Sequence, residues 1–141
     1  MEYNIILRSD NRLDGEQLSN FHLQLHNLKI NKDREYIITF DAVLFNIVLP
    51  DADTNIYYII EINGIGSYLC YDSINAGEQN TIKIIVGNSM NLNTYIEYYK
   101  REFRIKSLDL SQINIKIYDS DNNLITSNDG KLIVSFKVKQ I

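Results

Sequence analysis

The sequence predicts a single, nearly all-β domain, a sandwich or barrel built from eight or nine short strands. Apolar residues alternate with polar ones in most segments, as Phe21, Leu23 and Leu25 do, and this period of two is typical of strands with one buried face. Clusters of Asn, Asp, Ser and Gly separate the segments, which is the turn chemistry of such folds. The length of 141 residues suits one domain with its own core, and we find no internal repeat or linker.

Nine segments carry the strand pattern. In chain order they are 2–7, 21–25, 36–49, 56–62, 68–71, 81–86, 103–105, 113–118 and 132–138. The alternation changes phase near Asp41 and Ala42, which predicts a β-bulge in the long third segment. Asn63-Gly64, the strongest short hairpin signal, predicts a tight turn between the fourth and fifth segments. A further turn at Gly130 leads into the last strand.

One segment departs from the strand pattern and predicts a short helix over 95–101. Thr94 and Glu97 have the spacing of a capping box, in which the Thr side chain caps the first turn and the Glu side chain reaches back to it. The tyrosines of this segment would then form an apolar stripe on one side of the helix.

The charge balance argues against a general phosphate-binding surface. Eighteen acidic and fourteen basic residues leave a formal net charge of −4, whereas nucleic-acid binding needs a basic excess. Segment 98–101 with Arg104 mixes Tyr with Lys and Arg, as single-strand binders do. Ordinary surface cations at the junction between the predicted helix and the next strand account for it equally well. Nucleic acid is therefore not an expected partner.

Cys70 is the only cysteine, so an intramolecular disulfide is impossible and a reducing compartment is suitable. Its neighbours Leu69 and Tyr71 indicate a strand position and a buried thiol, not a nucleophile. Residues 1–4 lack the pattern of a signal peptide, and no apolar run approaches the ~20 residues of a membrane span. We therefore expect a product made in the cell interior and not secreted.

His22 and His26 are the only histidines, and their spacing would suit zinc on a helix. The local pattern, however, is that of a strand, in which four residues separate the side chains by about 13 Å. That distance is too long for a shared metal, so solvent-facing strand residues are the better interpretation.

The stretch that begins with Asp119 and Asp121 opens like a calcium loop and then fails the pattern. Leu124 stands where the invariant Gly is needed, and Gly130 stands where the bidentate Glu is needed. Asp and Asn clusters are also favoured in β-turns. A turn is the prediction, with weak calcium binding as the alternative.

Two polar segments contain paired carboxylates, which are the usual general acids and bases. Asp10, Asp14 and Glu16 lie in a loop with Arg12 and Gly15 after the first strand, while Asp51 and Asp53 follow Pro50. For both segments a solvated loop is the better interpretation. Neither segment has a neighbouring nucleophile, and no phosphate-binding or nucleophile motif occurs in the chain. We expect no enzyme, no catalytic residue, no cofactor and no metal site.

The order of features resembles a known family. A first strand leads to Ser9-Asp10-Asn11-Arg12 and a Gly15 loop; segment 19–25 follows, and then a long strand ends at Leu49-Pro50. Near the end, segment 113–119 is followed by a polar turn that reaches Gly130 and by the closing strand 133–138. This order resembles the small single jelly-roll capsid proteins, of penton or minor capsid type, of large DNA viruses of protists, virophages and polinton-like elements.

The resemblance implies an antiparallel jelly-roll β-sandwich of about eight strands with one short helix, spanning residues 1–141. It implies a capsid penton at the vertex, or a minor capsid component, that self-assembles around a symmetry axis. The implied partners are further copies of the chain, as a pentamer, and the major capsid protein, and the implied location is the virion. Contacts would come from sheet edges and from loops 10–19 and 119–130.

A recognition module is the alternative, either a carbohydrate-binding domain or a fibre head. Such modules usually display aromatic platforms. Ten tyrosines permit a platform of this kind, but the chain contains no Trp.

Overall fold

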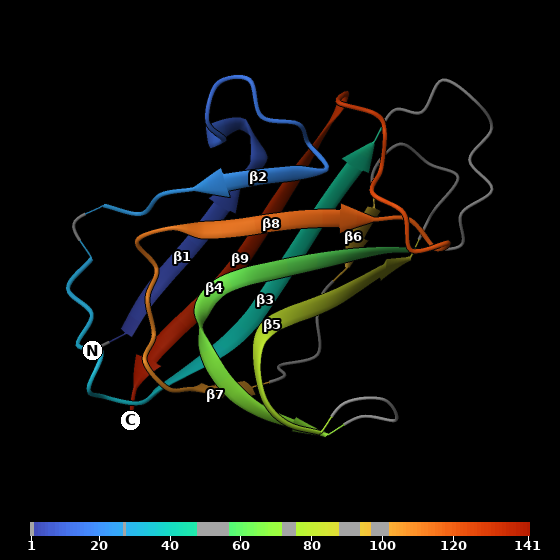
Figure 1. Ribbon diagram of the computed structural model, residues 1–141. Coiled ribbons are helices and arrows are strands. Elements are labelled where there is room, and N and C mark those ends of the chain that lie inside the picture. The colour runs from blue at the N-terminus through green and yellow to red at the C-terminus, as the bar shows by residue number, and fades with distance from the viewer. Residues whose placement is uncertain (1, 27, 48–56, 72–75, 88–93, 97–101) are drawn as a thin grey trace.

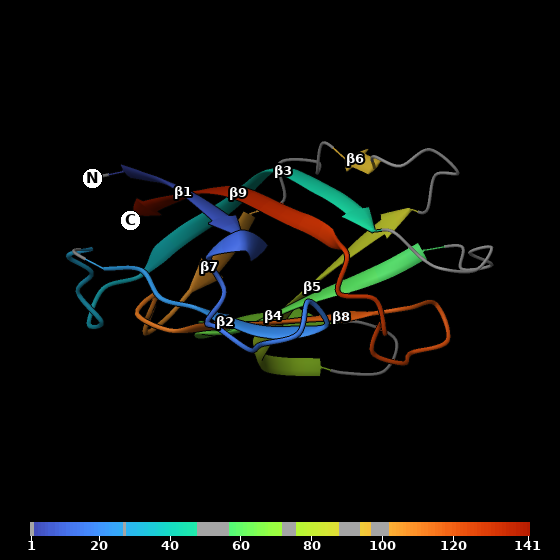
Figure 2. The same cartoon turned by 90° about the horizontal axis from the view of Figure 1, so that it is seen from above.

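Two antiparallel sheets pack face to face with the core between them (Figures 1 and 2). The computed structural model describes residues 2–26, 28–47, 57–71, 76–87, 94–96 and 102–141. One sheet contains, in spatial order, β1 (Glu2–Arg8), β9 (Gly130–Gln140), β3 (Tyr36–Ile47) and β6 (Thr94–Ile96), with β7 (Glu102–Ile105) also paired to β3. The other contains β2 (Asn20–Leu23), β8 (Ile113–Tyr118), β4 (Tyr57–Tyr71) and β5 (Ala76–Gly87).

Strands β6 and β7 share one edge of β3, because β9 occupies the opposite edge along its whole length. Each sheet therefore has four strand positions, and the chain crosses from one sheet to the other between β1, β2 and β3 (Figure 1). This is the arrangement of a jelly roll. It confirms the predicted all-β sandwich of about eight strands.

The alternation of apolar residues predicted the buried face of most strands correctly. In β8 the side chains of Ile113, Ile115 and Ile117 are fully buried, while the residues between them are half-buried. The inner faces of both sheets supply the core in the same way. The phase change near Asp41 is also confirmed as a bulge, because the register of β3 on β9 shifts between Phe40 and Ala42.

The predicted hairpin at Asn63-Gly64 is wrong. Strand β4, which is fifteen residues long, continues through Asn63 and Gly64. Its register on β5 shifts between Asn63 and Tyr68. Gly64 and Gly66 have positive φ values of 88° and 130°, so the glycines form a bend within one strand and do not reverse the chain. The Asn-Gly pair therefore marks a bend inside a strand, where its sequence predicts a reversal of the chain.

The predicted helix over 95–101 is wrong where the structure describes it. Thr94–Ile96 is strand β6, and its residues pair with Val43, Leu44 and Phe45 of β3. Thr, Tyr and Ile favour strands, and pairing with β3 outweighs the local capping signal. Residues 97–101 lie outside the described residues. Within the part of the chain that the structure describes, the one helical element is a 3-10 turn, Ser9–Asn11.

Candidate assembly surfaces

Loops 10–19 and 119–130, which the family resemblance assigned to intersubunit contacts, meet at one end of the sandwich. The backbone N–H of Leu18 donates to Oδ1 of Asn128 at 3.0 Å. The amide of Asn128 also donates to Oε1 of Gln17. Two segments more than a hundred residues apart in sequence thus form one surface, which we call the acidic loop surface.

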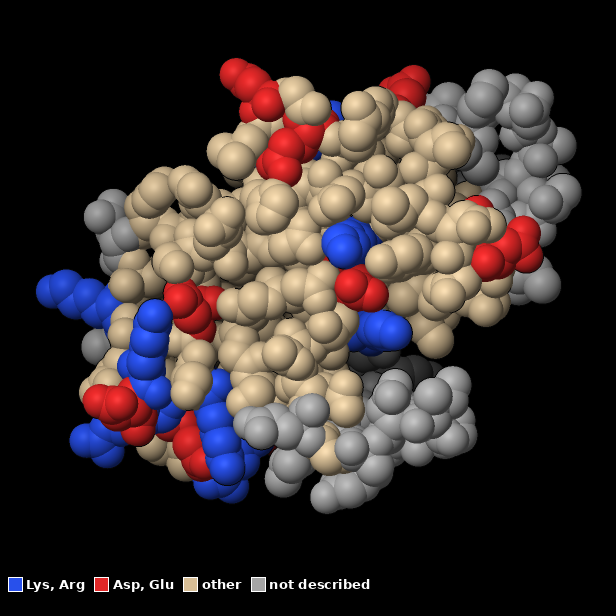
Figure 3. Space-filling model, in the orientation of Figure 1, with Lys and Arg blue, Asp and Glu red and all other residues tan. Residues whose placement is uncertain are grey.

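The acidic loop surface is strongly negative. Its two loops contain six carboxylates, while Arg12 is their only Lys or Arg; the carboxylates are those of Asp10, Asp14, Glu16, Asp119, Asp121 and Asp129. Lys131 pairs with Asp10 from the adjoining strand at 3.3 Å. In Figure 3 the side chains at the upper and right margins are mainly red, and most blue ones lie at the lower left. The charges of this chain are therefore unevenly distributed between its two ends.

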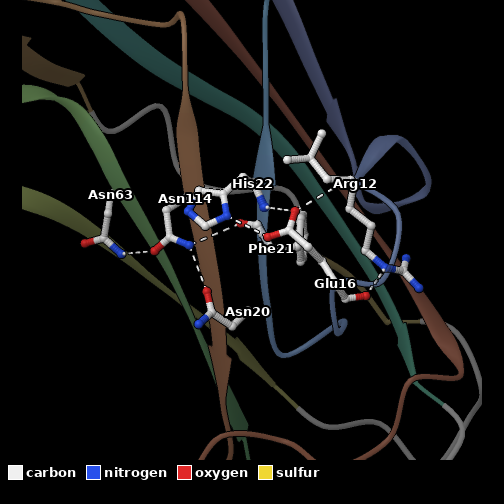
Figure 4. Close-up of polar contacts among 8 residues, drawn as sticks. Arg12, Glu16, Asn20, Phe21, His22, Asn63 and Asn114 are labelled. Carbon is white, nitrogen blue, oxygen red and sulfur yellow. Dashed lines mark hydrogen bonds and ion pairs between the residues drawn. The ribbon is translucent and has the colours of Figure 1, made fainter.

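Glu16 organises loop 10–19 and is not poised for acid-base catalysis. Its carboxylate accepts the backbone N–H groups of His22 at 2.9 Å and Leu13 at 3.3 Å, and it lies 2.6 Å from Nδ1 of His22 (Figure 4). Burial raises the pKa of Glu16, but the hydrogen bonds and charge of His22 outweigh burial and lower it overall. A carboxylate held ionised in this way fixes a loop.

Replacing Glu16 by Gln tests this role. Because the folded-state pKa of Glu16 is lowered, the ionised carboxylate stabilises the fold above its unfolded-state pKa, and this stabilisation is lost as the pH falls. We expect Glu16→Gln to reduce the free energy of unfolding by about 1 kcal/mol at about pH 6 and by less at about pH 3, measured by urea titration. The control is Asp14→Asn, an exposed carboxylate of the same loop. A deficit that is equally large at both pH values contradicts the assignment.

The two histidines are not a ligand pair in the structure. His22 lies on β2 and contacts Glu16, whereas His26 is exposed beyond the end of that strand. The stretch at Asp119 is a turn, as predicted: its carboxylate accepts the N–H groups of Asp121 and Asn123 at 3.0 and 2.9 Å. Among the described residues, no group of three His, Cys, Asp or Glu side chains could hold a metal ion.

The remaining chemical candidates are only partly described. Cys70 lies on β4, as its neighbours predicted, although the burial of its side chain is outside the described set. Arg104 forms an ion pair with Glu35, with 2.6 Å between its Nη2 and Oε2. Segment 98–101 and the pair Asp51 and Asp53 lie outside the described residues. In the described parts of the chain, no helix is long and apolar enough to cross a bilayer.

The outer face of the β2-β8-β4-β5 sheet carries a row of hydrogen-bonded polar side chains. Asn114 Nδ2 donates to Asn20 Oδ1 at 2.8 Å, and Asn63 Nδ2 donates to Asn114 Oδ1 at 3.3 Å (Figure 4). Thr81 Oγ1 donates to Asn63 Oδ1 at 2.6 Å. The row joins all four strands, so it stiffens the sheet.

A second row on the same outer face is apolar. Tyr118 pairs with Leu124 on one side and with Ile59 on the other, and Ile59 pairs with Ile85. Leu124 is 40% exposed and Ile85 is 57% exposed. We call these four residues the apolar row. Figure 3 shows that most of this face is uncharged. The sequence does not indicate this row, because Ile59 and Ile85 stand next to isoleucines that are buried. Only the pairing of the strands shows that Ile59 and Ile85 face outward.

A small cavity lies at the opposite end of β8. Its volume is about 210 Å³, and Leu108 and Leu110, both buried, form part of its wall. Lys32 and Asp109 stand at its margin and form an ion pair of 3.0 Å. Hydrogen bonds from Ser111, together with Lys32, lower the pKa of Asp109 to about 2. We call this feature the Leu108 cavity.

Comparison with known proteins establishes the fold. No protein-family model matches the sequence, and no curated protein matches it. Two solved structures are only weakly similar and support no argument. Drosophila NLP-core, studied for pentamer formation and histone binding, matches with a TM-score of 0.37 and 11% identity, covering 100% of this chain and 98% of that chain. The VP1 pentamer of Washington University Polyomavirus matches with a TM-score of 0.35 and 11% identity, covering 99% of this chain and 95% of that chain.

The penton protein of mavirus is more similar. Its structure matches with a TM-score of 0.51 and 9% sequence identity, and the match covers 99% of each chain. At this identity the likeness shows a shared fold and nothing finer. It confirms the predicted structural resemblance of this chain to a penton protein.

Proposed function

We propose that the protein is a structural component of a virus capsid, a penton or minor capsid protein that assembles as a pentamer at the vertex and contacts the major capsid protein. The observation that carries the proposal is the fold match to the mavirus penton protein over 99% of both chains. A match of this extent leaves little of either chain for an added catalytic unit. The function would then reside in surfaces, and the virion is the place where the protein acts.

The distribution of surface chemistry supports assembly into a closed ring. A ring of identical subunits uses a heterologous contact, in which two different surfaces of each copy meet. The acidic loop surface and the Leu108 cavity lie at opposite ends of β8 and differ in shape and charge. A two-fold dimer would instead need one self-complementary surface.

Light scattering after size-exclusion chromatography tests the proposal. At protein concentrations of about 0.1 mM we expect a particle with five times the 16.4 kDa mass of the chain. Averaged electron micrographs of that particle should show five-fold symmetry. A protein that stays monomeric at millimolar concentration, and that is not retained by a major capsid protein, would contradict the proposed function.

A recognition module is the second candidate, and one hollow favours it. The bend in β4 borders an open hollow of about 420 Å³ whose lining includes the uncharged polar residues Asn63, Ser67, Asn80, Thr81 and Ser107. Amides and hydroxyls of this kind recognise neutral saccharides. Glycan-array binding that Asn80→Ala abolishes would support this function, and an array without signal would reject it.

A further inference from the structure

The Leu108 cavity has the size of a socket for one or two apolar side chains. Its volume of about 210 Å³ lies below the roughly 300–1,000 Å³ of typical small-molecule sites. Leu25, Leu28 and Ile30 complete the wall, and all three are partly buried against the core. An apolar side chain inserted there would therefore contact leucine and isoleucine on several sides.

The opposite end of β8 offers a matching projection. Tyr118 ends the strand, and Leu124 projects from loop 119–130 beside it with 40% of its surface exposed. The six residues of β8 separate this projection from the Leu108 cavity by about 20 Å. Socket and projection thus lie at the two ends of a rigid strand, so one copy cannot fill its own cavity.

The charges around the two features are complementary. Segments 28–34 and 106–111, which contribute most of the lining of the cavity, contain four cations and two carboxylates in their sequence. Asp109, one of those carboxylates, is paired with Lys32, whose side chain is 66% exposed. The acidic loop surface around Leu124 has six carboxylates and one arginine in its loops. Complementary potentials of this kind favour one docking orientation and speed encounter.

We propose that the acidic loop surface of one copy docks on the Leu108 cavity of the next copy, with the side chain of Leu124 inserted into the cavity. The inference rests on the proposed function and specifies its interface. Each copy uses its socket for one neighbour and its projection for the other, so the contact is heterologous and closes when the rotation between copies completes a ring. Tyr118 and Ile59, next to Leu124 in the apolar row, lose exposed surface in the same contact.

Two complementary variants test the contact. Leu124→Ser removes the projection, and Ser111→Trp places an indole at the mouth of the cavity, since Ser111 is an exposed residue of its lining. Each variant alone should raise the concentration for half-assembly about tenfold or more. An equimolar mixture should form a one-to-one dimer and no ring, because only the cavity of the Leu124→Ser copy can accept Leu124 of the other.

Matched controls separate this contact from general effects on the surface. Ile6→Ser removes an apolar side chain of similar exposure, 48%, from β1 of the other sheet, and Gln112→Trp adds an indole next to the cavity but outside its lining. Both controls should assemble like the wild type. Thermal melts establish that every variant folds; if Ser111→Trp does not, Lys32→Glu at the exposed margin of the cavity replaces it, with the same expected dimer in the mixture.

The outcomes distinguish this inference from the proposed function. If the wild type forms pentamers and Leu124→Ser forms them equally well, the interface lies elsewhere and only the inference is overturned. If the wild type is monomeric, the proposed function fails. The contact is then measured by adding unlabelled Ser111→Trp protein to ¹⁵N-labelled Leu124→Ser protein. Shifts at residues 108–110 support the contact, and an unchanged spectrum overturns it.

Discussion

Replacing Gly66 by Ala should lower the free energy of unfolding by about 3 kcal/mol and the melting temperature by about 10 °C. Gly66 has a φ value of 130°, which L-residues with a side chain rarely adopt. A methyl group added there would lie 2.6 Å from Cγ2 of Ile105 and 2.7 Å from the carbonyl oxygen of Lys106. The second contact is with backbone, so the chain itself must shift.

The backbone around Gly66 connects the two sheets, which is why a shift there is costly. The next residue, Ser67, exchanges two backbone hydrogen bonds with Lys106, at 3.1 and 2.8 Å. The N–H of Asp109 donates to the carbonyl of Ile65 at 3.1 Å. These bonds hold the segment that follows β7 against β4, and the same segment forms a wall of the Leu108 cavity.

Gly87→Ala is the matched control for Gly66→Ala. Gly87 ends the neighbouring strand β5, its φ is not positive, and a methyl group there would meet nothing within 4 Å. We expect a change of less than about 1 kcal/mol, because an unstrained Ala mainly restricts the unfolded chain. Differential scanning calorimetry measures both variants. Equal melting temperatures for Gly66→Ala and the wild type would show that the bend relaxes without cost.

The strands could be predicted because their signal is local. Alternation such as that of Ile113, Ile115 and Ile117 requires only that one face of the strand be buried. This holds whichever strand is the neighbour, so the pattern can be recognised without knowing the partner. The two wrong predictions rest on signals whose outcome depends on distant residues. Asn63-Gly64 would favour a hairpin in isolation, but Asn63 pairs with Asn114 on one side and Thr81 on the other, so the strand continues. The capping box at Thr94 likewise yields to pairing with Phe45.

The candidate surfaces were predictable in part. The family resemblance selected loops 10–19 and 119–130, and their polar composition agrees with exposure, but no pattern indicates that Leu18 bonds to Asn128. The apolar row could not be recognised at all, since Leu124 becomes a neighbour of Tyr118 only in the folded chain. A sequence shows which residues are apolar. Pairing and register decide which of them remain outside the core.

Replacing Phe103 by Ala should reduce the free energy of unfolding by about 4 kcal/mol, a large part of the roughly 5–15 kcal/mol available to a domain. Phe103 is buried on β7, a strand of only four residues. Its ring packs edge to face against Phe40 of its own sheet, at 5.7 Å between centroids, and against Tyr68 of the opposite sheet, at 5.1 Å. Removing it leaves a cavity between the sheets and breaks an aromatic contact between them.

Phe103→Leu separates lost volume from lost aromatic geometry. Leucine fills most of the space of the phenyl ring but cannot form edge-to-face contacts, which contribute about 0.5–1.5 kcal/mol per pair beyond the buried area. We therefore expect the leucine variant to lose about 1.5 kcal/mol, well under half of the loss in Phe103→Ala, in urea titrations with unchanged m-values. If both variants lose the same amount, the aromatic contacts to Phe40 and Tyr68 account for the effect, and the cavity does not. A β7 strand that peels away without unfolding the rest would instead lower the m-value, because less surface would remain to be exposed in the main transition.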